Sequence, residues 1–260
     1  MHDKEEKLKA YGRLLDIMDD LRQGCPWDRK QTFDSLRHLT IEEVYELSDA
    51  IIDKDYERIK EELGDILLHI VFYSKLGEEI NRFDAADVAR HISEKLIKRH
   101  PHIYGDIKVN DEEEVKRNWE ALKMKEGKKS VLEGVPRSLP AMIKAMRMQE
   151  KAAGIGFDWK NQNDVKKKVE EEWKELEEAV KTGDKNKMEE ELGDVLFSLI
   201  NYARFLKINP ETALEKINKK FKKRFEYIEQ QAGKQGKDIR KLSLEEMDAL
   251  WNEHKNLHED

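Results

Sequence analysis

Residues 171–205 read EEWKELEEAVKTGDKNKMEEELGDVLFSLINYARF, and residues 42–76 read EEVYELSDAIIDKDYERIKEELGDILLHIVFYSKL. The two stretches align without a gap at a constant offset of 129 residues, with 13 identities in 35 positions. Charge-rich helical sequences share some residues by chance, but an ungapped match of this length indicates an internal duplication. The chain therefore contains two copies of one structural unit.

Apolar residues in each copy recur with the spacing of a helix that has one buried face. They stand at positions 63, 66, 67, 70 and 71, and again at 192, 195, 196, 199 and 200. The residues Thr182-Gly183-Asp184 are typical of one helix end followed at once by the next N-cap, so we expect antiparallel helices joined by a tight turn. No stretch alternates with the period of a strand. We predict an all-α fold of tandem duplicated helical bundles.

We expect the paired helices over about 33–53 and 55–80 in the first copy, and over about 162–182 and 184–206 in the second. Further helices are expected over about 3–23, 84–99, 111–126, 140–153, 210–232 and 243–256. Turn-forming residues are dense in GKKSVLEGVPRSL at 127–139, where the helical periodicity stops. We therefore predict an N-terminal domain over 1–126, a linker over 127–139 and a C-terminal domain over 140–260.

The composition narrows the classes of function. Charged residues make up 40% of the chain and the net charge is −7, which gives no general attraction to nucleic acid or to anionic membranes. The single cysteine, Cys25, excludes an internal disulfide. No apolar run approaches the roughly 20 residues that span a bilayer, and the N-terminus lacks the apolar core of a signal peptide. We expect a cytoplasmic protein without nucleic-acid or membrane partners.

Acidic residues occur in pairs three positions apart on the paired helices, so the members of a pair share a helix face. The same two pairs stand in both copies, beside the apolar stripe, and form two quartets: Glu43, Glu46, Glu62 and Asp65, and Glu172, Glu175, Glu191 and Asp194. If the stripes pack together, four carboxylates converge, and such a cluster needs cations or raised pKa values. Oxygen-only ligands suit magnesium or manganese.

Two other interpretations of the acids stay open. A solvated acidic face is the usual meaning of a single Glu-x-x-Glu motif, although the repetition at fixed spacing argues against it here. Helical bundles also hold di-iron sites with glutamate and histidine ligands. His69 lies four residues after Asp65, but its counterpart is Ser198, so we expect His69 to pack or to form a hydrogen bond instead.

Basic side chains near the quartets point to a phosphorylated ligand. Lys220 and Arg224 are four residues apart on one helix, as are Lys95 and Arg99. Lys187 and its counterpart Arg58 precede an acid of the quartet by four residues. Two tryptophans late in the halves, Trp119 and Trp251, are candidates for stacking on a base, with core packing as the alternative.

Several runs are similar to the MazG family of nucleoside triphosphate pyrophosphohydrolases. They are GCPWDRKQT (24–32), TIEEVYEL (40–47), EELGD (61–65), KRHPH (98–102), GFDW (156–159), EELGD (190–194) and the helix from Lys220 to Arg224. The resemblance implies a homodimer that completes the bundles. It also implies magnesium-dependent hydrolysis of nucleoside triphosphates, ordinary or damaged, to the monophosphate and pyrophosphate.

The resemblance also assigns candidate roles to single residues. The positions of Glu172, Glu175, Glu191 and Asp194 hold metal in the family, and the first-half matches are Glu43, Glu46, Glu62 and Asp65. The candidate nucleotide contacts are Lys168, Lys187, Lys220, Arg224 and Trp251, with Arg58, Lys95, Arg99 and Trp119 in the first half. Because basic residues are denser at 216–224 than at 91–99, we expect the second half to bind the substrate.

We hypothesise that a magnesium-activated water attacks the α-phosphorus, that a carboxylate accepts its proton, and that basic side chains neutralise the departing pyrophosphate. Two alternatives to this function remain. One is a dimeric helical scaffold without catalysis. The other is a pyrophosphohydrolase of narrower specificity, for a deoxyuridine or phosphoribosyl nucleotide.

Overall fold

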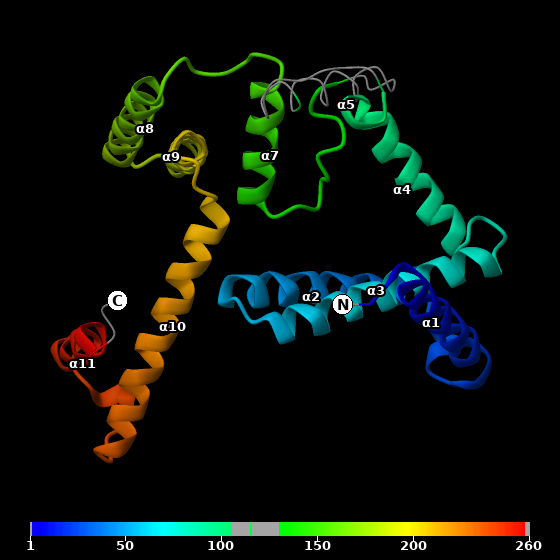
Figure 1. The fold of residues 1–260 in the computed structure, drawn as a ribbon. Helices are drawn as coiled ribbons and strands as arrows, with labels where there is room; N and C mark the ends of the chain where they lie inside the picture. The colour runs from blue at the N-terminus through cyan, green and yellow to red at the C-terminus, as the bar shows by residue number, and fades with distance from the viewer. Residues whose placement is uncertain (1, 106–114, 116–129, 258–260) are drawn as a thin grey trace. The chain divides into compact units, whose positions relative to one another are not determined.

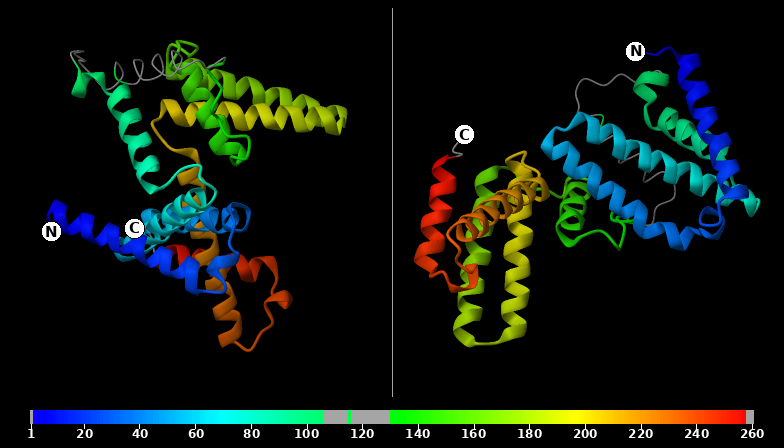
Figure 2. Two further views of the ribbon diagram at one scale, coloured as in Figure 1. Left: turned by 90° about the vertical axis from the view of Figure 1, so that its right-hand side faces the viewer. Right: turned by 90° about the horizontal axis from the view of Figure 1, so that it is seen from below.

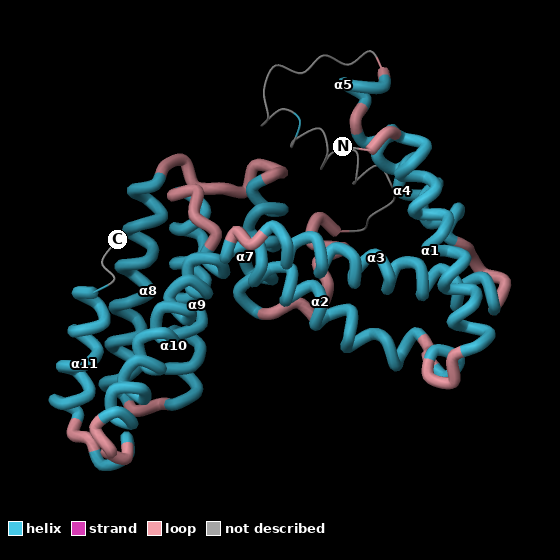
Figure 3. The backbone as a smooth tube through the Cα atoms, turned by 60° about the horizontal axis from the view of Figure 1, so that its bottom comes forward, coloured by secondary structure: helices cyan, strands magenta, loops and turns pink. Residues whose placement is uncertain are grey.

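The computed structural model describes residues 2–105, 115 and 130–257, and within these ranges every regular element is a helix (Figure 3). The chain divides into two compact units, residues 1–111 and 112–260. None of the described helices combines the length and the apolar character needed to cross a membrane. The expected all-α tandem fold is confirmed.

The first unit is built on a hairpin of α2 and α3, with α1 packed against α3 (Figure 1). Its core consists of Met18, Leu36, Val71, Phe72 and Leu76. The elements are α1 (Lys4–Gly24), η1 (Asp28–Lys30), α2 (Phe33–Asp53), α3 (Tyr56–Glu79), α4 (Ala85–Arg99) and α5 (Pro101–Tyr104).

The second unit contains two hairpins, α8–α9 and α10–α11, and α7 and α10 both contact α9 (Figure 2). Ile228, Ala232 and Leu242 form a buried cluster where α11 packs against α10. The elements are α7 (Ala141–Ala153), α8 (Gln162–Thr182), α9 (Lys185–Phe205), α10 (Pro210–Lys234), η2 (Ile239–Lys241) and α11 (Leu244–Leu257).

Two consecutive residues form the turn of each hairpin: the first ends one helix in a left-handed conformation, and the second caps the start of the next helix. Gly183 ends α8 with φ 73°, a left-handed conformation that glycine adopts without steric cost, and the Asp184 side chain then caps α9 by accepting from the backbone N–H of Asn186 and Lys187. In the first copy Lys54 has φ 56°, and Asp55 accepts from the N–H of Arg58. The predicted antiparallel pairs with a tight turn are therefore confirmed.

The other expected helices are present with bounds that differ by a few residues, except the helix over 111–126. That helix lies, apart from Val115, outside the described residues. Residues 130–139 of the expected linker form turns, and 127–129 are not among the described residues. The sequence did not predict the short helices α5, η1 and η2, because their three or four residues contain too little periodicity to recognise.

Candidate metal and nucleotide site

Each hairpin brings three carboxylates together. In the first unit they belong to Glu43 and Glu46 on α2 and Glu62 on α3, and one oxygen from each lies within 4.8 Å of the others. In the second unit the same distance limit holds for Glu172 and Glu175 on α8 and Glu191 on α9. We call these two sets the first and second acidic groups. They occupy identical positions in the repeat, so the duplication preserves the spatial arrangement as well as the sequence.

The fourth acid of each predicted quartet stands outside these groups of three among the described residues. Asp65 is half-buried, and its charge helps to raise the pKa of Glu43, so it lies close to the first group. Asp194 is exposed. The structure thus gathers three of the four predicted acids in each repeat.

Mutual repulsion and the loss of hydration raise the pKa values of two carboxylates in the first group. Desolvation, followed by the charges of Asp65 and Glu46, raises the pKa of Glu43 above its ordinary value. Desolvation and then Glu46 raise the pKa of Glu62, while Arg58 opposes the shift. A cluster in which repulsion and burial raise the pKa of Glu43 and Glu62 is suited to binding a cation, which would relieve both effects.

In the second group, desolvation and then the charges of Glu172 and Glu191 raise the pKa of Glu175, and Lys168 opposes the shift. Lys168 itself donates to Glu171 at 2.7 Å and lies 2.8 Å from the buried Glu172. These hydrogen bonds, to Glu171 and then to Glu172, raise the pKa of the Lys168 ammonium above its ordinary value, so this side chain stays charged.

The remaining predicted cations lie in the same two units as the acids. Arg58 is exposed and forms an ion pair with Asp53 at 4.0 Å. Lys187 is exposed in the first turn of α9. Lys220 lies on α10, exposed and without an ion-pair partner among the described residues. Lys95 and Arg99 lie half-buried on α4.

Trp251 has the packing role that the sequence left open beside base stacking, and a cation also lies over its ring. Its ring packs beside the buried cluster of α10 and α11. The Arg224 guanidinium also lies over the same ring, 5.1 Å from its centroid, and the ring of Phe221 is 5.2 Å away. An arginine stacked on an aromatic ring keeps hydrogen-bond donors free for a phosphate. Trp119, the predicted counterpart, lies outside the described residues.

His69 is a packed side chain with a hydrogen bond, as the sequence predicted. It is buried, its Nδ1 lies 2.6 Å from Thr40 Oγ1, and its ring meets the edge of Tyr73. Burial lowers its pKa, which keeps the imidazole neutral. Among the described residues, His69 is in neither group of converging side chains that could hold a metal ion.

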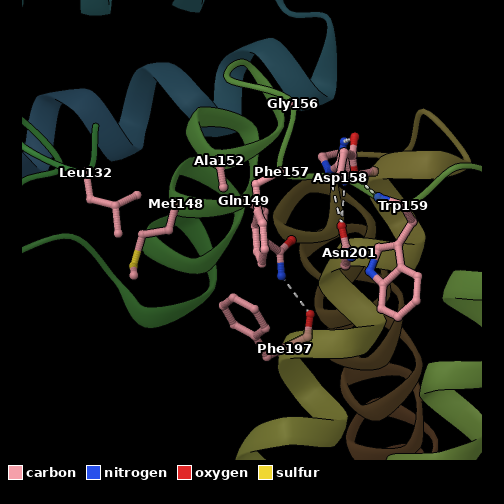
Figure 4. A pocket seen from close by; sticks show the side chains of 11 residues that line it. Leu132, Met148, Gln149, Ala152, Gly156, Phe157, Asp158, Trp159, Phe197 and Asn201 are labelled. Carbon is pink, nitrogen blue, oxygen red and sulfur yellow. Dashed lines mark hydrogen bonds and ion pairs between the residues drawn. The ribbon is translucent and has the colours of Figure 1, made fainter. Parts of the chain in front are cut away.

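A cavity of about 520 Å³ lies in the second unit between α7, α9 and the segment that precedes α8 (Figure 4). Phe157, Trp159 and Phe197 supply aromatic walls, and Arg204 donates to Asp158 at 2.8 Å on one side. Gln149 donates to the Phe197 carbonyl at 2.8 Å. Sequence reasoning did not predict this cavity, since residues 148–159 and the distant residues 197–204 form its walls together and no spacing rule connects them.

The chain is a duplicated all-α protein with an acidic group in each hairpin and basic side chains in the same units, an arrangement that suits a helical enzyme with a phosphorylated substrate. Residues 31–104 and 160–228 match the MazG nucleotide pyrophosphohydrolase domain. The chain belongs to this family and is an enzyme of the hydrolase class.

Relatives support the assignment over nearly the full length. The nucleoside triphosphate pyrophosphohydrolase/pyrophosphatase MazG of Thermotoga maritima is 44% identical over 94% of this chain and 95% of its own. The nucleoside triphosphate pyrophosphohydrolase of Escherichia coli strain K12 is 40% identical over 95% of this chain and 98% of its own. The uncharacterised protein YabN of Bacillus subtilis is 46% identical over 97% of this chain and 53% of its own.

Proposed function

We propose that this enzyme hydrolyses nucleoside triphosphates to the monophosphate and pyrophosphate, with magnesium held by the acidic groups, as part of cytoplasmic nucleotide-pool control. The observation that carries the proposal is the group of three converging carboxylates, repeated at identical positions in both hairpins. The names of the relatives from Thermotoga maritima and Escherichia coli support the choice of substrate class. The two family matches lie within the domains 1–126 and 140–260, which we propose as the two domains of the enzyme.

The second acidic group fits magnesium by its chemistry. Its donors are all carboxylate oxygens, which hard divalent cations prefer, and manganese suits the same donors. A bound magnesium ion would supply positive charge that screens the phosphates and activates water. Glu172, Glu175 and Glu191 would hold the ion, with Asp194 as the fourth acid of the quartet.

The other side chains would act on the substrate directly. A carboxylate of the quartet that does not hold the ion accepts the proton of the attacking water. Lys168, Lys187, Lys220 and Arg224 neutralise the triphosphate and the oxygens of the departing pyrophosphate. The exposed face of the aromatic cluster around Trp251 offers a surface on which a base can stack.

We assign the substrate to the second half in preference to the first. Lys168 contacts Glu172 of the second acidic group, whereas the residue at the matching position in the first half is Leu39, which carries no charge. The helix α10, which carries Lys220 and Arg224, contacts α9 of the same unit. A triphosphate that bears up to four negative charges favours the half with more cations.

An apolar stripe on each hairpin supports the proposal of a homodimer. Leu192, Leu196 and Leu199 are between 42 and 50% exposed on α9, and their counterparts Leu63, Leu67 and Ile70 are exposed on α3. The spacing of four and three residues places each trio on one helix face. We propose that a second copy of the chain covers these stripes and completes the bundles.

The decisive experiment incubates the protein with each nucleoside triphosphate and magnesium in water enriched in oxygen-18. Attack at the α-phosphorus breaks its bond to the bridging oxygen, so the label enters the monophosphate and the pyrophosphate stays unlabelled. Orthophosphate with diphosphate, or labelled pyrophosphate, would contradict the proposal. Turnover of only a deoxyuridine or phosphoribosyl nucleotide would assign a narrower specificity, and no turnover of any triphosphate would favour a scaffold.

A further inference from the structure

Lys168 forms an ion pair with Glu172, the buried acid of the second acidic group. It precedes Glu172 by one helical turn on α8, and its Nζ lies 2.8 Å from Glu172 Oε1. The Glu172 side chain is 9% exposed and that of Lys168 is 34% exposed. One oxygen of a candidate metal ligand therefore already has a positively charged partner, which solvent can still reach.

The first repeat has no such contact at the corresponding position. Helices α2 and α8 are both 21 residues long and begin 129 residues apart, so the ungapped register assigns Leu39 to Lys168. Leu39 packs against the core of the first unit. Arg58 and Lys187, in contrast, are counterparts that both repeats share. Lys168 is thus a cation that distinguishes the second site from the first.

A divalent ion and the Lys168 ammonium compete for the same carboxylate. They also repel each other, since both are positive and the site lies partly out of water. A triphosphate changes this balance because its oxygens are alternative acceptors for the lysine. Transfer of Lys168 from Glu172 to a phosphate frees the carboxylate for the ion and removes the repulsion.

We propose that Lys168 is an internal counter-ion which couples metal binding to nucleotide binding at the second site, while the first site takes up metal independently of nucleotide. The inference rests on the proposed function, since it takes both acidic groups as metal sites. Lys168 acts here as a positioning residue for the ion. Because coupling between two ligands is reciprocal, the metal must improve nucleotide affinity by the same factor.

The test measures the binding of manganese to the intact chain by calorimetry, without turnover. Glu46→Gln removes a ligand of the first group and so isolates the second. In this background we expect Lys168→Met to increase manganese affinity about tenfold, within the range typical of coupled sites. Lys166→Met is the matched control because Lys166 lies on the same helix and pairs with the exposed Glu170, so we expect less than a twofold effect.

The second arm repeats each titration with an α,β-methylene triphosphate, which resists cleavage at the proposed bond. The analogue should raise manganese affinity about tenfold in Glu46→Gln, and much less once Lys168→Met is added. Lys168→Arg should restore the coupling. In Glu175→Gln, where the first site remains, the analogue should change manganese affinity little.

Equal effects of Lys168→Met and Lys166→Met, or undiminished coupling in Lys168→Met, would overturn the role of Lys168. Failure of the proposed function has a different signature. In that case manganese would bind Glu46→Gln and the double variant Glu46→Gln, Glu175→Gln with the same affinity, which would show that the acidic group holds no metal.

Discussion

Each acidic group contains one buried glutamate, and the buried residue is not the same member of the repeat. In the first unit it is Glu62 on α3, and in the second it is Glu172 on α8. A buried carboxylate is costly unless a cation compensates it, and the nearby cations differ accordingly. The charge of Arg58 acts on Glu62, whereas Lys168 contacts Glu172 directly. The two sites thus have acids at the same repeat positions, but different cations act on the buried acid.

We expect Glu175→Gln to lower kcat/KM for nucleoside triphosphates on the order of 100-fold. In the proposed site the change would remove one ligand of an ion that contributes several kcal/mol to the transition state, and each 1.4 kcal/mol is a factor of ten. Steady-state kinetics with pyrophosphate detection measures the loss. Glu46→Gln, the corresponding change in the first group, is the matched control and should retain most of the activity. Loss of turnover only in Glu46→Gln would assign catalysis to the first half.

The raised pKa values of Glu43, Glu62 and Glu175 predict how stability depends on pH. Without metal, the folded chain binds protons at these acids more tightly than the unfolded chain does. Their contribution to the free energy of unfolding is therefore full below the unfolded pKa of about 4.3, and it is lost as the pH rises through the folded values. Magnesium would bind the deprotonated acids in the site we propose, and would therefore reverse this order.

The increase in Tm caused by magnesium, relative to a chelator, should consequently grow as the pH rises through the raised pKa values. Differential scanning calorimetry over a pH series measures it. The double variant Glu46→Gln, Glu175→Gln should show a much smaller increase at every pH. An increase of the same size at acidic and neutral pH would contradict metal binding by these carboxylates.

The same hairpin turn is formed by different residues in the two repeats. Position 183 is glycine and position 54 is lysine, yet both residues are left-handed, with φ values of 73° and 56°. A Cβ at Gly183 would meet no atom within 4 Å, so only the backbone conformation opposes a side chain there. For residues with a Cβ, this conformation costs about 1 to 2 kcal/mol.

Exchange of the two turn residues should therefore have effects of opposite sign. We expect Gly183→Lys to destabilise the chain by about 1 kcal/mol, and Lys54→Gly to stabilise it by up to about the same amount. Urea unfolding followed by circular dichroism measures both. Lys54→Ala, which removes the charge but keeps the Cβ, should not stabilise the chain. If Lys54→Ala stabilised it as much as Lys54→Gly, charge and not backbone conformation would be the cause.

At the scale of the whole molecule, the exposed stripes on α3 and α9 predict self-association. We expect Leu196→Glu to shift the protein from dimer toward monomer, because a charge inserted into a covered apolar face is left without a partner. Light scattering coupled to size exclusion measures the mass. Leu67→Glu tests the stripe of the first repeat in the same way.

Leu244→Glu is the control for this prediction, since Leu244 is exposed but lies on α11 and belongs to neither stripe. It should leave the mass unchanged. A monomeric wild-type chain at micromolar concentration would refute the homodimer.

The sequence by itself determined the all-α class, the duplication, the hairpin turns and the positions of the acids. These features are local: helix periodicity, N-caps and three-residue spacing depend on neighbours within a few turns. The Asp184 cap and the register of 129 residues between α2 and α8 were therefore recognisable without coordinates.

Only the tertiary structure decided which acids converge and which of them are buried. The sequence predicted quartets, but Asp65 and Asp194 stand outside the groups of three. It also placed Lys168 only among the candidate nucleotide contacts, whereas the structure pairs this residue with Glu172. The physical reason is that such distances depend on how two helices are rotated and packed against each other, and that rotation is set by contacts between side chains far apart in the sequence.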